Sequence, residues 1–338
     1  MTEGHVVVTG ANGFIGRHVC SKLIEAGRTV TACVREGADD STLDNCLGAM
    51  KLCRFLPGQE ARLAKVFDQA NAVIHLAGRA HVMHETVSDP LAEFRKVNVR
   101  FTSNLASLAV RSGVKRFIYL SSIKVNGEAT EGRPFLADDP PGYCDPYGQS
   151  KWEAEEALQD TAAGSGMEWV IVRPPLVYGP HVGGNFLALM KHVFRRTPLP
   201  IGRLRNSRSL VSVYNLSDLL GVLVDHPNAA NQRFLVSDAE DISTLGLVRQ
   251  LATAMHRDSW LLPLPESFLK MLGSALGKRS AAQRLCSSLV LDRRKTAETL
   301  GWKAPEPFER SLRRTAEWFL SSAAALRLAR RGKPREES

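Results

Sequence analysis

The sequence lacks several features that would place it in other protein classes. Its six cysteines include no CxxC pair, so no metal site is indicated and free thiols in a reducing compartment are expected. No uncharged apolar run reaches the roughly eighteen residues of a membrane-spanning helix, and no signal peptide precedes the first apolar segment. No nucleic-acid-binding module accompanies the formal net charge of +9. We therefore expect a cytoplasmic protein without a membrane span or nucleic-acid partner, whose charge serves small phosphorylated ligands.

Apolar runs rich in β-branched residues alternate with longer helical patterns through the first half of the chain. This alternation predicts an α/β fold with βαβ units and a doubly wound parallel sheet. We expect strands at His5–Thr9, Thr29–Val34, Met50–Phe55, Ala72–Leu76, Arg116–Leu120 and Glu168–Val172. Apolar stripes with a 3.6-residue period predict two long helices that pack on this sheet, at Pro90–Ser112 and Pro146–Ala163.

The composition of the sequence changes after Pro174: Pro, Gly and Arg become more frequent, and the expected helices and strands become shorter. We predict a main domain over residues 1–175, with a further strand near Arg233–Ser237. A smaller α/β lobe is expected to take up most of residues 176–325, and residues 326–338 are expected to form a basic tail. The amphipathic segment Glu266–Leu276 predicts a packed helix, with a helix on a membrane surface as the alternative.

A glycine-rich turn, TGANGFIG, lies between the first strand and the first helix. Gly10, Gly13 and Gly16 permit a tight turn and let a pyrophosphate approach backbone N–H groups at a helix N-terminus. This position in the chain predicts a dinucleotide site, with a plain strand-to-helix turn as the alternative.

The end of the second strand bears on which dinucleotide is bound. A carboxylate there would accept hydrogen bonds from a ribose 2′-hydroxyl, but the sequence has Val34 at that place and Arg35 next to it. Because a cation suits a 2′-phosphate, we favour NADP(H) over NAD(H). In the alternative, Arg35 is a solvated loop residue and Glu36 binds the ribose.

Polar groups in two further segments have spacings that suit proton transfer. Tyr147 and Lys151 are four residues apart, so on a helix they share a face, where an ammonium would lower the pKa of the phenol. Ser121 and Ser122 follow an expected strand and so face the ligand crevice of a parallel sheet. Helix capping and turn formation are the structural alternatives for these residues.

Several motifs in order resemble one family, the extended short-chain dehydrogenase/reductases, in the branch of nucleotide-sugar epimerases, dehydratases and reductases. They cover most of the chain and read TGANGFIG, VIHLAG, NVRFTSNLA, FIYLSSIKVNG, YGQSK, RPPLVYGP and RSLVSVYNLSDLL. The resemblance implies a Rossmann domain and a C-terminal lobe that binds a nucleotide diphosphate. It also implies a homodimer in which the two long helices of each subunit form a four-helix bundle.

The resemblance implies roles for individual residues. Tyr147 would be the acid/base, Lys151 its pKa-lowering and ribose-binding partner, and Ser122 a second hydroxyl on the substrate oxygen. The implied substrate contacts are Ser122, Lys124, Asn185 and Arg208. The implied cofactor contacts are Gly10, Asn12, Gly13, Phe14, Ile15, Gly16, Arg35, Leu76, Ala77, Gly78, Asn98, Tyr147, Lys151 and Pro174.

Departures from the family pattern narrow the expected reaction. Ile123 and Lys124 stand where 4,6-dehydratases carry an Asp-Glu pair, so dehydration has no acid and base. The third strand runs into Leu56 rather than into the Asp that holds adenine in many members. The expected activity is 4-ketoreduction of a UDP-4-keto-6-deoxy-N-acetylhexosamine in bacterial surface polysaccharide synthesis. Three alternatives remain: a UDP-hexose 4-epimerase, a non-catalytic dinucleotide-binding protein, and a reductase of uncharged ketones, the last disfavoured by the arginines around Arg208.

Overall fold

A seven-stranded parallel sheet forms the centre of the main domain. The computed structural model describes residues 4–56, 58–79, 88–275 and 279–322. The strand order is β3-β2-β1-β4-β5-β6-β9. The strands are β1 (His5–Thr9), β2 (Thr29–Arg35), β3 (Lys51–Phe55), β4 (Ala72–His75), β5 (Arg116–Leu120), β6 (Glu168–Arg173) and β9 (Gln232–Leu235). Because the chain runs outward in opposite directions from β1 and β4, a ligand crevice is expected beyond the carboxyl ends of these two strands.

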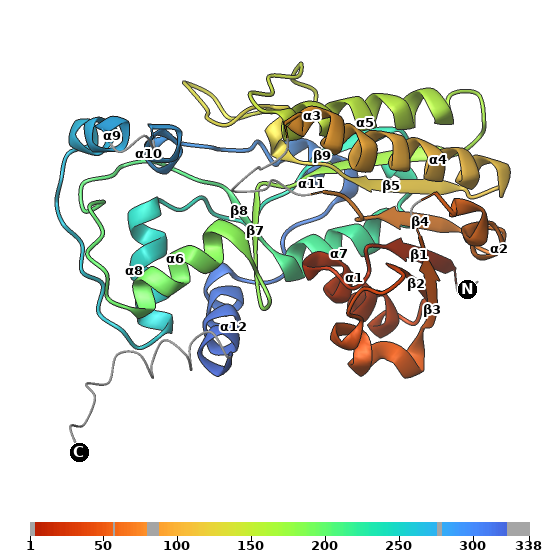
Figure 1. The fold of residues 1–338 in the computed structure, drawn as a ribbon, viewed down its shortest axis with the longest axis horizontal. Coiled ribbons are helices and arrows are strands. Elements are labelled where there is room, and N and C mark those ends of the chain that lie inside the picture. Colours follow the sequence, from red (N-terminus) through yellow and green to blue (C-terminus); the bar gives the residue numbers. More distant parts are fainter. Residues whose placement is uncertain (1–3, 57, 80–87, 276–278, 323–338) are drawn as a thin grey trace.

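Helices cover both faces of this sheet (Figure 1). Val6 and Val8 of β1 point to one face and belong to one core, whereas Val7 belongs to the other, as the period of two in a strand requires. The first core is shared with α1 (Phe14–Glu25), α7 (Val213–Leu223) and α11 (Arg294–Leu300). The second is shared with α2 (Ala64–Phe67), α4 (Phe101–Arg111) and α5 (Pro146–Ala162).

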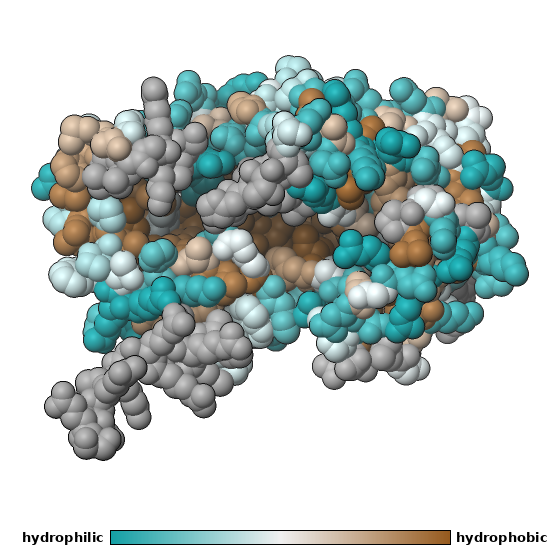
Figure 2. Space-filling model, viewed as in Figure 1, coloured by the Kyte–Doolittle hydropathy of each residue, from teal (hydrophilic) through white to brown (hydrophobic). Residues whose placement is uncertain are grey.

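The smaller lobe lies beside the sheet and has its own core (Figure 1). It contains a pair of short parallel strands, β7 (Leu176–Tyr178) and β8 (Leu210–Ser212). Its helices are α6 (Gly184–Phe194), α8 (Thr244–Ala254), α9 (Glu266–Ala275), α10 (Arg279–Cys286) and α12 (Phe308–Ser321). Figure 2 shows apolar residues gathered in a recess on this face, between the region of α9 and α10 and the region of α6 and α8.

The predicted fold class is correct, and the strands begin and end within two residues of the predicted positions. The helix predicted over Pro90–Ser112 is present and continuous, but its middle is wider: a π-helical segment, Arg95–Arg100, joins α3 (Pro90–Phe94) to α4. Helix α9 is present and packs through Leu269, while Met271 stays 61% exposed. Leu276 and the predicted basic tail lie outside the described residues, and the domain boundary at residue 175 remains a prediction.

Candidate active site

The glycine turn is packed tightly against its neighbours. The Gly10 and Ala11 N–H groups donate to the Cys33 carbonyl at 3.1 and 3.4 Å, which fixes the turn to β2. Gly10 has φ of +71°, and a Cβ there would lie 2.8 Å from the Ala77 nitrogen. A Cβ on Gly16 would lie 2.2 Å from the Gly10 carbonyl oxygen. Close contact of backbone with backbone therefore requires glycine at both positions.

The N-terminus of α1 is suited to hold an anion. Its N-cap is Gly13, no side chain caps it, and no acidic residue lies in its first turn, so a ligand can satisfy its first N–H groups. The side chains of Phe14 and Ile15 pack against the two neighbouring cores, which leaves only their backbone for a ligand. The Asn12 side-chain amide donates to the Asp39 carbonyl at 2.9 Å and braces the turn. These residues fit the pyrophosphate of a dinucleotide.

The chain after β4 passes close to the lysine of α5. Leu76 and Ala77 are half-buried, and a Cβ on Gly78 would lie 3.1 Å from the Asn98 side-chain oxygen and 3.5 Å from Lys151 Nζ. Asn98 lies in the π-helical segment, accepts from the Arg79 N–H at 2.8 Å and donates to the Arg79 carbonyl at 3.1 Å. Asn98 thus organises the backbone of this loop at the carboxyl end of β4, and its implied contact with the cofactor remains a prediction.

The end of β2 places no carboxylate where a ribose acid was expected. Val34 is buried and Arg35 is exposed, and Arg35 forms no ion pair within the described part of the chain. Glu36 lies 3.5 Å from Arg62 across the surface. The arginine is therefore available to a ligand, whereas the neighbouring carboxylate already has a cationic partner.

Ser122 and Tyr147 lie next to each other at the mouth of the crevice. The Ser122 side chain is hydrogen-bonded to the Tyr147 phenol, and its Oγ also accepts from the Lys124 N–H at 3.2 Å. Tyr147 lies in the first turn of α5, which Asp145 caps by accepting from the Gly148 N–H at 2.7 Å. The carbonyl of buried Pro174 accepts from the Ile123 N–H at 3.0 Å and holds the serine loop in place.

Lys151 is buried one helical turn below Tyr147. Its ammonium donates to the Tyr119 hydroxyl at 3.0 Å and to the Leu120 carbonyl at 2.8 Å. Burial lowers the pKa of Lys151 to about 7, and the negative charge of Glu155 works in the opposite direction. An ammonium of this kind is poised to change its charge near neutral pH.

One expectation about this pair is wrong for the protein without ligands. The sequence predicted that Lys151 lowers the pKa of the tyrosine, but burial raises the pKa of Tyr147 to about 12, with a hydrogen bond from Ser122 opposing it and Asp145 adding to it. The reason is that the ammonium is directed to Tyr119 and the end of β5 rather than to the Tyr147 oxygen. The phenol is accordingly a proton donor at neutral pH.

The expected substrate contacts are more scattered. Lys124 forms ion pairs with Glu128 and, at 2.8 Å, with Asp145, so its charge is already balanced. Asn185 is exposed in the first turn of α6. Arg208 donates from Nη1 to the carbonyls of Arg284 and Ser287 at 2.9 and 3.1 Å, so its guanidinium lies at the C-terminal end of α10.

Burial lowers the pKa of Arg208, and no carboxylate within the described residues pairs with it. A partly buried guanidinium without an anionic partner favours binding of a phosphate or carboxylate.

The sequence interpretation missed a buried network beneath the site. Glu155, fully buried on α5, accepts from Ser121 Oγ and forms a two-point ion pair with Arg173 at 2.6 and 2.9 Å. Ser121 thus faces this network rather than the crevice. The signal was present, because Glu155 is four residues after Lys151 and falls on the same helix face.

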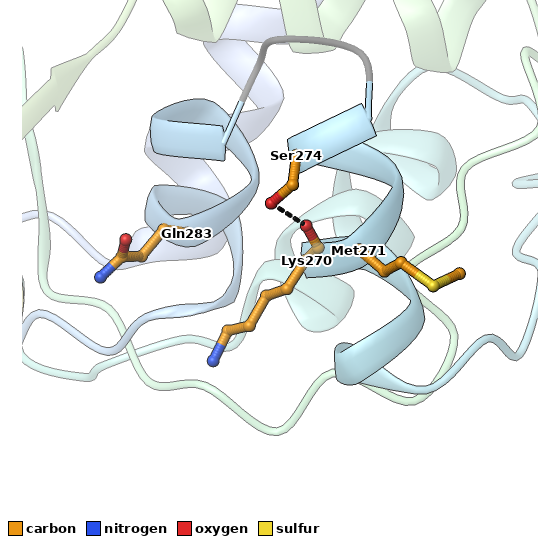
Figure 3. Close-up of a pocket in the computed structure, with 4 residues that line it drawn as sticks. All are labelled: Lys270, Met271, Ser274 and Gln283. Carbon is orange, nitrogen blue, oxygen red and sulfur yellow. Dashed lines mark hydrogen bonds between the residues drawn. The ribbon is translucent and has the colours of Figure 1, made fainter.

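The lobe also contains a cavity away from the Ser122, Tyr147 and Lys151 cluster. A cavity of about 370 Å³ lies between α9 and α10 and is lined by Lys270, Met271, Ser274 and Gln283 (Figure 3). Lys270 is paired with Glu266 at 2.6 Å, and Ser274 Oγ donates to the Lys270 carbonyl at 2.9 Å. Within the described ranges, no cluster of side chains suits a metal ion and no helix is long and apolar enough to cross a membrane.

The parallel sheet agrees with comparison to known families. The model of the NAD dependent epimerase/dehydratase family matches residues 6–237. The chain belongs to this family. It is therefore an enzyme that uses a nicotinamide dinucleotide, and the pyrophosphate-binding geometry of the glycine turn fits that cofactor.

Individual relatives support this assignment. The chain is 43% identical over 323 residues to UDP-glucose 4-epimerase of Vibrio cholerae, covering 94% of this chain and 96% of the relative. It is 25% identical over 277 residues to the N-acetyl-α-D-glucosaminyl-diphospho-ditrans,octacis-undecaprenol 4-epimerase of Escherichia coli O157:H7, covering 77% and 82%.

Solved structures share the fold of this family member. UDP-glucose 4-epimerase of Thermotoga maritima with UDP-glucose superposes with a TM-score of 0.75 at 23% identity, covering 93% of this chain and 98% of that one. The Bordetella bronchiseptica enzyme WbmG with NAD and UDP gives a TM-score of 0.73 at 18% identity, covering 94% of each chain.

Proposed function

We propose that this epimerase/dehydratase family member oxidises or reduces C4 of a UDP-sugar, with Tyr147 as the acid/base. The observation that carries the proposal is the contact of the Ser122 hydroxyl with the Tyr147 phenol beside buried Lys151. The Vibrio cholerae relative, a UDP-glucose 4-epimerase by name, supports a UDP-sugar as substrate. Arg208, which lacks a carboxylate partner within the described residues, is the proposed ligand of the diphosphate. Lys124 and Asn185 remain weaker proposals as substrate contacts.

The roles of the three side chains follow from their chemistry. A nicotinamide dinucleotide held by the glycine turn of Gly10, Gly13 and Gly16 would accept or supply the hydride at the sugar carbon. Tyr147, protonated at neutral pH, donates its proton to the sugar oxygen as a carbonyl becomes an alcohol, and takes it back in the reverse direction. Ser122 hydrogen-bonds the same sugar oxygen and so positions it beside the Tyr147 phenol. The ammonium of Lys151 stabilises the negative charge that develops on Tyr147.

The first candidate net reaction is 4-epimerisation. It is supported by the 43% identity to the Vibrio cholerae enzyme over nearly the whole length of both chains. In this reaction the phenolate of Tyr147, whose charge the Lys151 ammonium stabilises, takes the proton of the C4 hydroxyl, and the resulting phenol returns it after the keto sugar has turned over. Reduced cofactor must then stay bound throughout the cycle.

The second candidate is 4-ketoreduction of a UDP-4-keto-6-deoxy-N-acetylhexosamine, which serves bacterial surface polysaccharide synthesis. It is favoured by exposed Arg35 beside buried Val34 at the end of β2, an arrangement that suits NADP(H) better than NAD(H). A reductase must exchange its cofactor every turnover, and β3 ends at Phe55 before Leu56 without the acidic residue that would hold adenine. Absence of an acid and base at Ile123 and Lys124 disfavours 4,6-dehydration.

Two further proposals concern the assembly of the protein and the parts of the chain that hold each ligand. We propose a homodimer in which α4 and α5 pair with the same helices of a second copy, because these helices lie side by side on one face of the sheet (Figure 1). We also propose that the nicotinamide dinucleotide is held by residues before about position 175, and that the lobe containing α6 and α10 supplies the sugar-nucleotide contacts.

Purified protein tests these reactions directly. UDP-glucose and UDP-N-acetylglucosamine are incubated without added reductant, and UDP-4-keto-6-deoxy-N-acetylglucosamine is incubated with NADPH or NADH. C4 inversion without consumption of reduced cofactor supports the epimerase, and stoichiometric consumption supports the reductase.

Tyr147→Phe removes only the phenol oxygen. We expect it to abolish either activity while cofactor binding stays within a few fold, and normal turnover of this variant would refute the assignment of the acid/base. Arg35→Ala is expected to weaken NADPH binding by about tenfold or more and to leave NADH binding nearly unchanged. An equal effect on both cofactors would remove the argument for NADP(H).

A further inference from the structure

The ammonium of Lys151 is held by a side chain outside the Ser122, Tyr147 and Lys151 cluster. Tyr119, on β5, is fully buried, and its hydroxyl accepts from Lys151 Nζ at 3.0 Å. The ammonium also lies 4.5 Å from the centroid of the Tyr119 ring, a distance at which a cation is attracted to the ring face. A second N–H goes to the Leu120 carbonyl at 2.8 Å. Two of the three N–H groups are therefore directed into the end of β5.

A buried chain of hydrogen bonds fixes the direction of the Tyr119 proton. Thr102 donates its own proton to the Asn98 carbonyl at 2.6 Å, so it can only accept from its other neighbours. One neighbour is His75 Nε2 at 3.0 Å, and the other is the Tyr119 hydroxyl. Tyr119 must therefore donate to Thr102, which leaves its oxygen lone pairs for Lys151.

His75 completes the chain and gives it a single polarity. Burial lowers the pKa of His75 to about 3, so the ring is neutral and carries one N–H. Because Nε2 donates to Thr102, Nδ1 accepts from the Thr9 hydroxyl at 2.6 Å. Thr9 is the last residue of β1, directly before the glycine turn. The chain therefore connects the turn that holds the cofactor to the lysine of the catalytic helix.

We propose that Tyr119 is a positioning residue that holds Lys151 as an ammonium and aims its remaining N–H into the crevice. This inference rests on the proposed function for its effect on turnover, but its effect on the lysine is independent of any substrate. Within the described residues the third N–H has no partner, and the missing side chain of Gly78 leaves room on that side.

The other charged or titratable groups around Lys151 come from three elements. On α5, Glu155 favours the ammonium, but it is itself neutralised by Arg173 of β6 at 2.6 Å. Tyr147 on α5 and His75 on β4 are uncharged at neutral pH. With the neighbouring carboxylate already paired, the hydroxyl of Tyr119 and the Leu120 carbonyl are the direct acceptors that keep the lysine charged.

Tyr119→Phe tests the proposal because it keeps the ring and its packing and removes one oxygen. Selective ¹⁵N labelling of lysine side chains, with Lys151→Met to assign the signal, reports the pKa of Lys151 without substrate. Loss of a hydrogen bond to a charged group is expected to lower that pKa by about one to two units. Tyr178→Phe is the matched control, since it removes another buried phenol oxygen, 2.7 Å from Asp238 in the lobe, and should leave Lys151 unaffected.

Turnover supplies the second measurement. In Tyr119→Phe the alkaline limb of the kcat profile is expected to move toward acid by the same one to two units, roughly a tenfold or larger loss of kcat above neutral pH. An unchanged pKa of Lys151 in Tyr119→Phe would overturn the proposal even if the enzyme turns over UDP-sugars. A shifted pKa in a protein that acts on no UDP-sugar would instead refute the proposed function and leave the positioning role standing.

Discussion

Replacing Lys151 with methionine should make the protein inactive and, at neutral pH, more stable. The side chain is 6% exposed, and burial lowers its pKa from 10.5 to about 7. Between these two pH values the native state binds fewer protons at this position than the unfolded chain does. The stability contributed by the neutral amine is therefore complete above about pH 10.5 and is lost as pH falls toward 7.

The magnitude follows from the pKa difference, 10.5 − 7, at about 1.4 kcal/mol per unit, which gives a limiting destabilisation of roughly 5 kcal/mol. At pH 7, where half of the native lysines are charged, the destabilisation is roughly 4 kcal/mol. Methionine removes this destabilisation, because its side chain is similar in length and carries no titratable group. It also leaves the Leu120 carbonyl without its donor, which costs about 1–3 kcal/mol at any pH. The net expectation is a gain of about 1–3 kcal/mol at pH 7 that disappears or reverses by pH 10.

Urea denaturation followed by tryptophan fluorescence measures this difference, since the chain has five tryptophans. Wild type and Lys151→Met are compared at intervals from pH 7 to pH 10. Lys115→Met, at an exposed position before β5, controls for the change in net charge. The informative quantity is the change in the stability difference with pH, about 3 kcal/mol over this range, because the cost of the lost hydrogen bond is constant. A difference that does not vary with pH would refute the view that Lys151 is buried with a strongly lowered pKa.

Two further substitutions test the scaffold of the site. Gly16→Ala places a methyl group against the backbone of the glycine turn. We expect its affinity for the cofactor, measured by calorimetry, to fall at least tenfold and its free energy of unfolding to fall by about 1–3 kcal/mol. The control Gly221→Ala, at a position with open space around it, should change neither quantity, and equal losses in both variants would contradict the packing argument. Glu155→Gln leaves Arg173 charged and buried, with an expected loss of about 3–5 kcal/mol in denaturation. The control Glu153→Gln breaks a surface ion pair with Arg95 and should lower the free energy of unfolding by less than about 1 kcal/mol. Similar losses for the two glutamates would contradict the argument that burial makes the loss of the Glu155 charge more costly.

The parallel sheet and its order of elements could be predicted because local patterns specify them. Runs of β-branched residues marked each strand, and the glycine turn marked the first crossover. The positions of Ser122, Tyr147 and Lys151 also followed, since one motif ends a central strand and the other starts the helix that packs beside it.

The electrostatics of the site could not be predicted in the same way. Spacing showed that Tyr147 and Lys151 share a helix face, but it did not show where the ammonium points. Burial and the competing acceptor Tyr119, which lies 32 positions before the lysine in sequence, decide that direction. Burial of the phenol therefore raises the pKa of Tyr147, and Asp145 adds to the rise. The pairing of Glu155 with Arg173 was equally hidden, because it joins α5 to β6 through the core.

The glycine turn and the end of β2 differ in packing, and this difference bears on how the cofactor preference of such a protein can change. The glycine turn has no free space, and a substitution there disturbs the sheet. Arg35 and Glu36 follow Cys33, whose carbonyl accepts from the N–H groups of that turn, but they are exposed and support no core. Selection or engineering can therefore exchange one dinucleotide for another at the rim of β2 with little effect on folding, while the reaction chemistry stays under strict structural constraint.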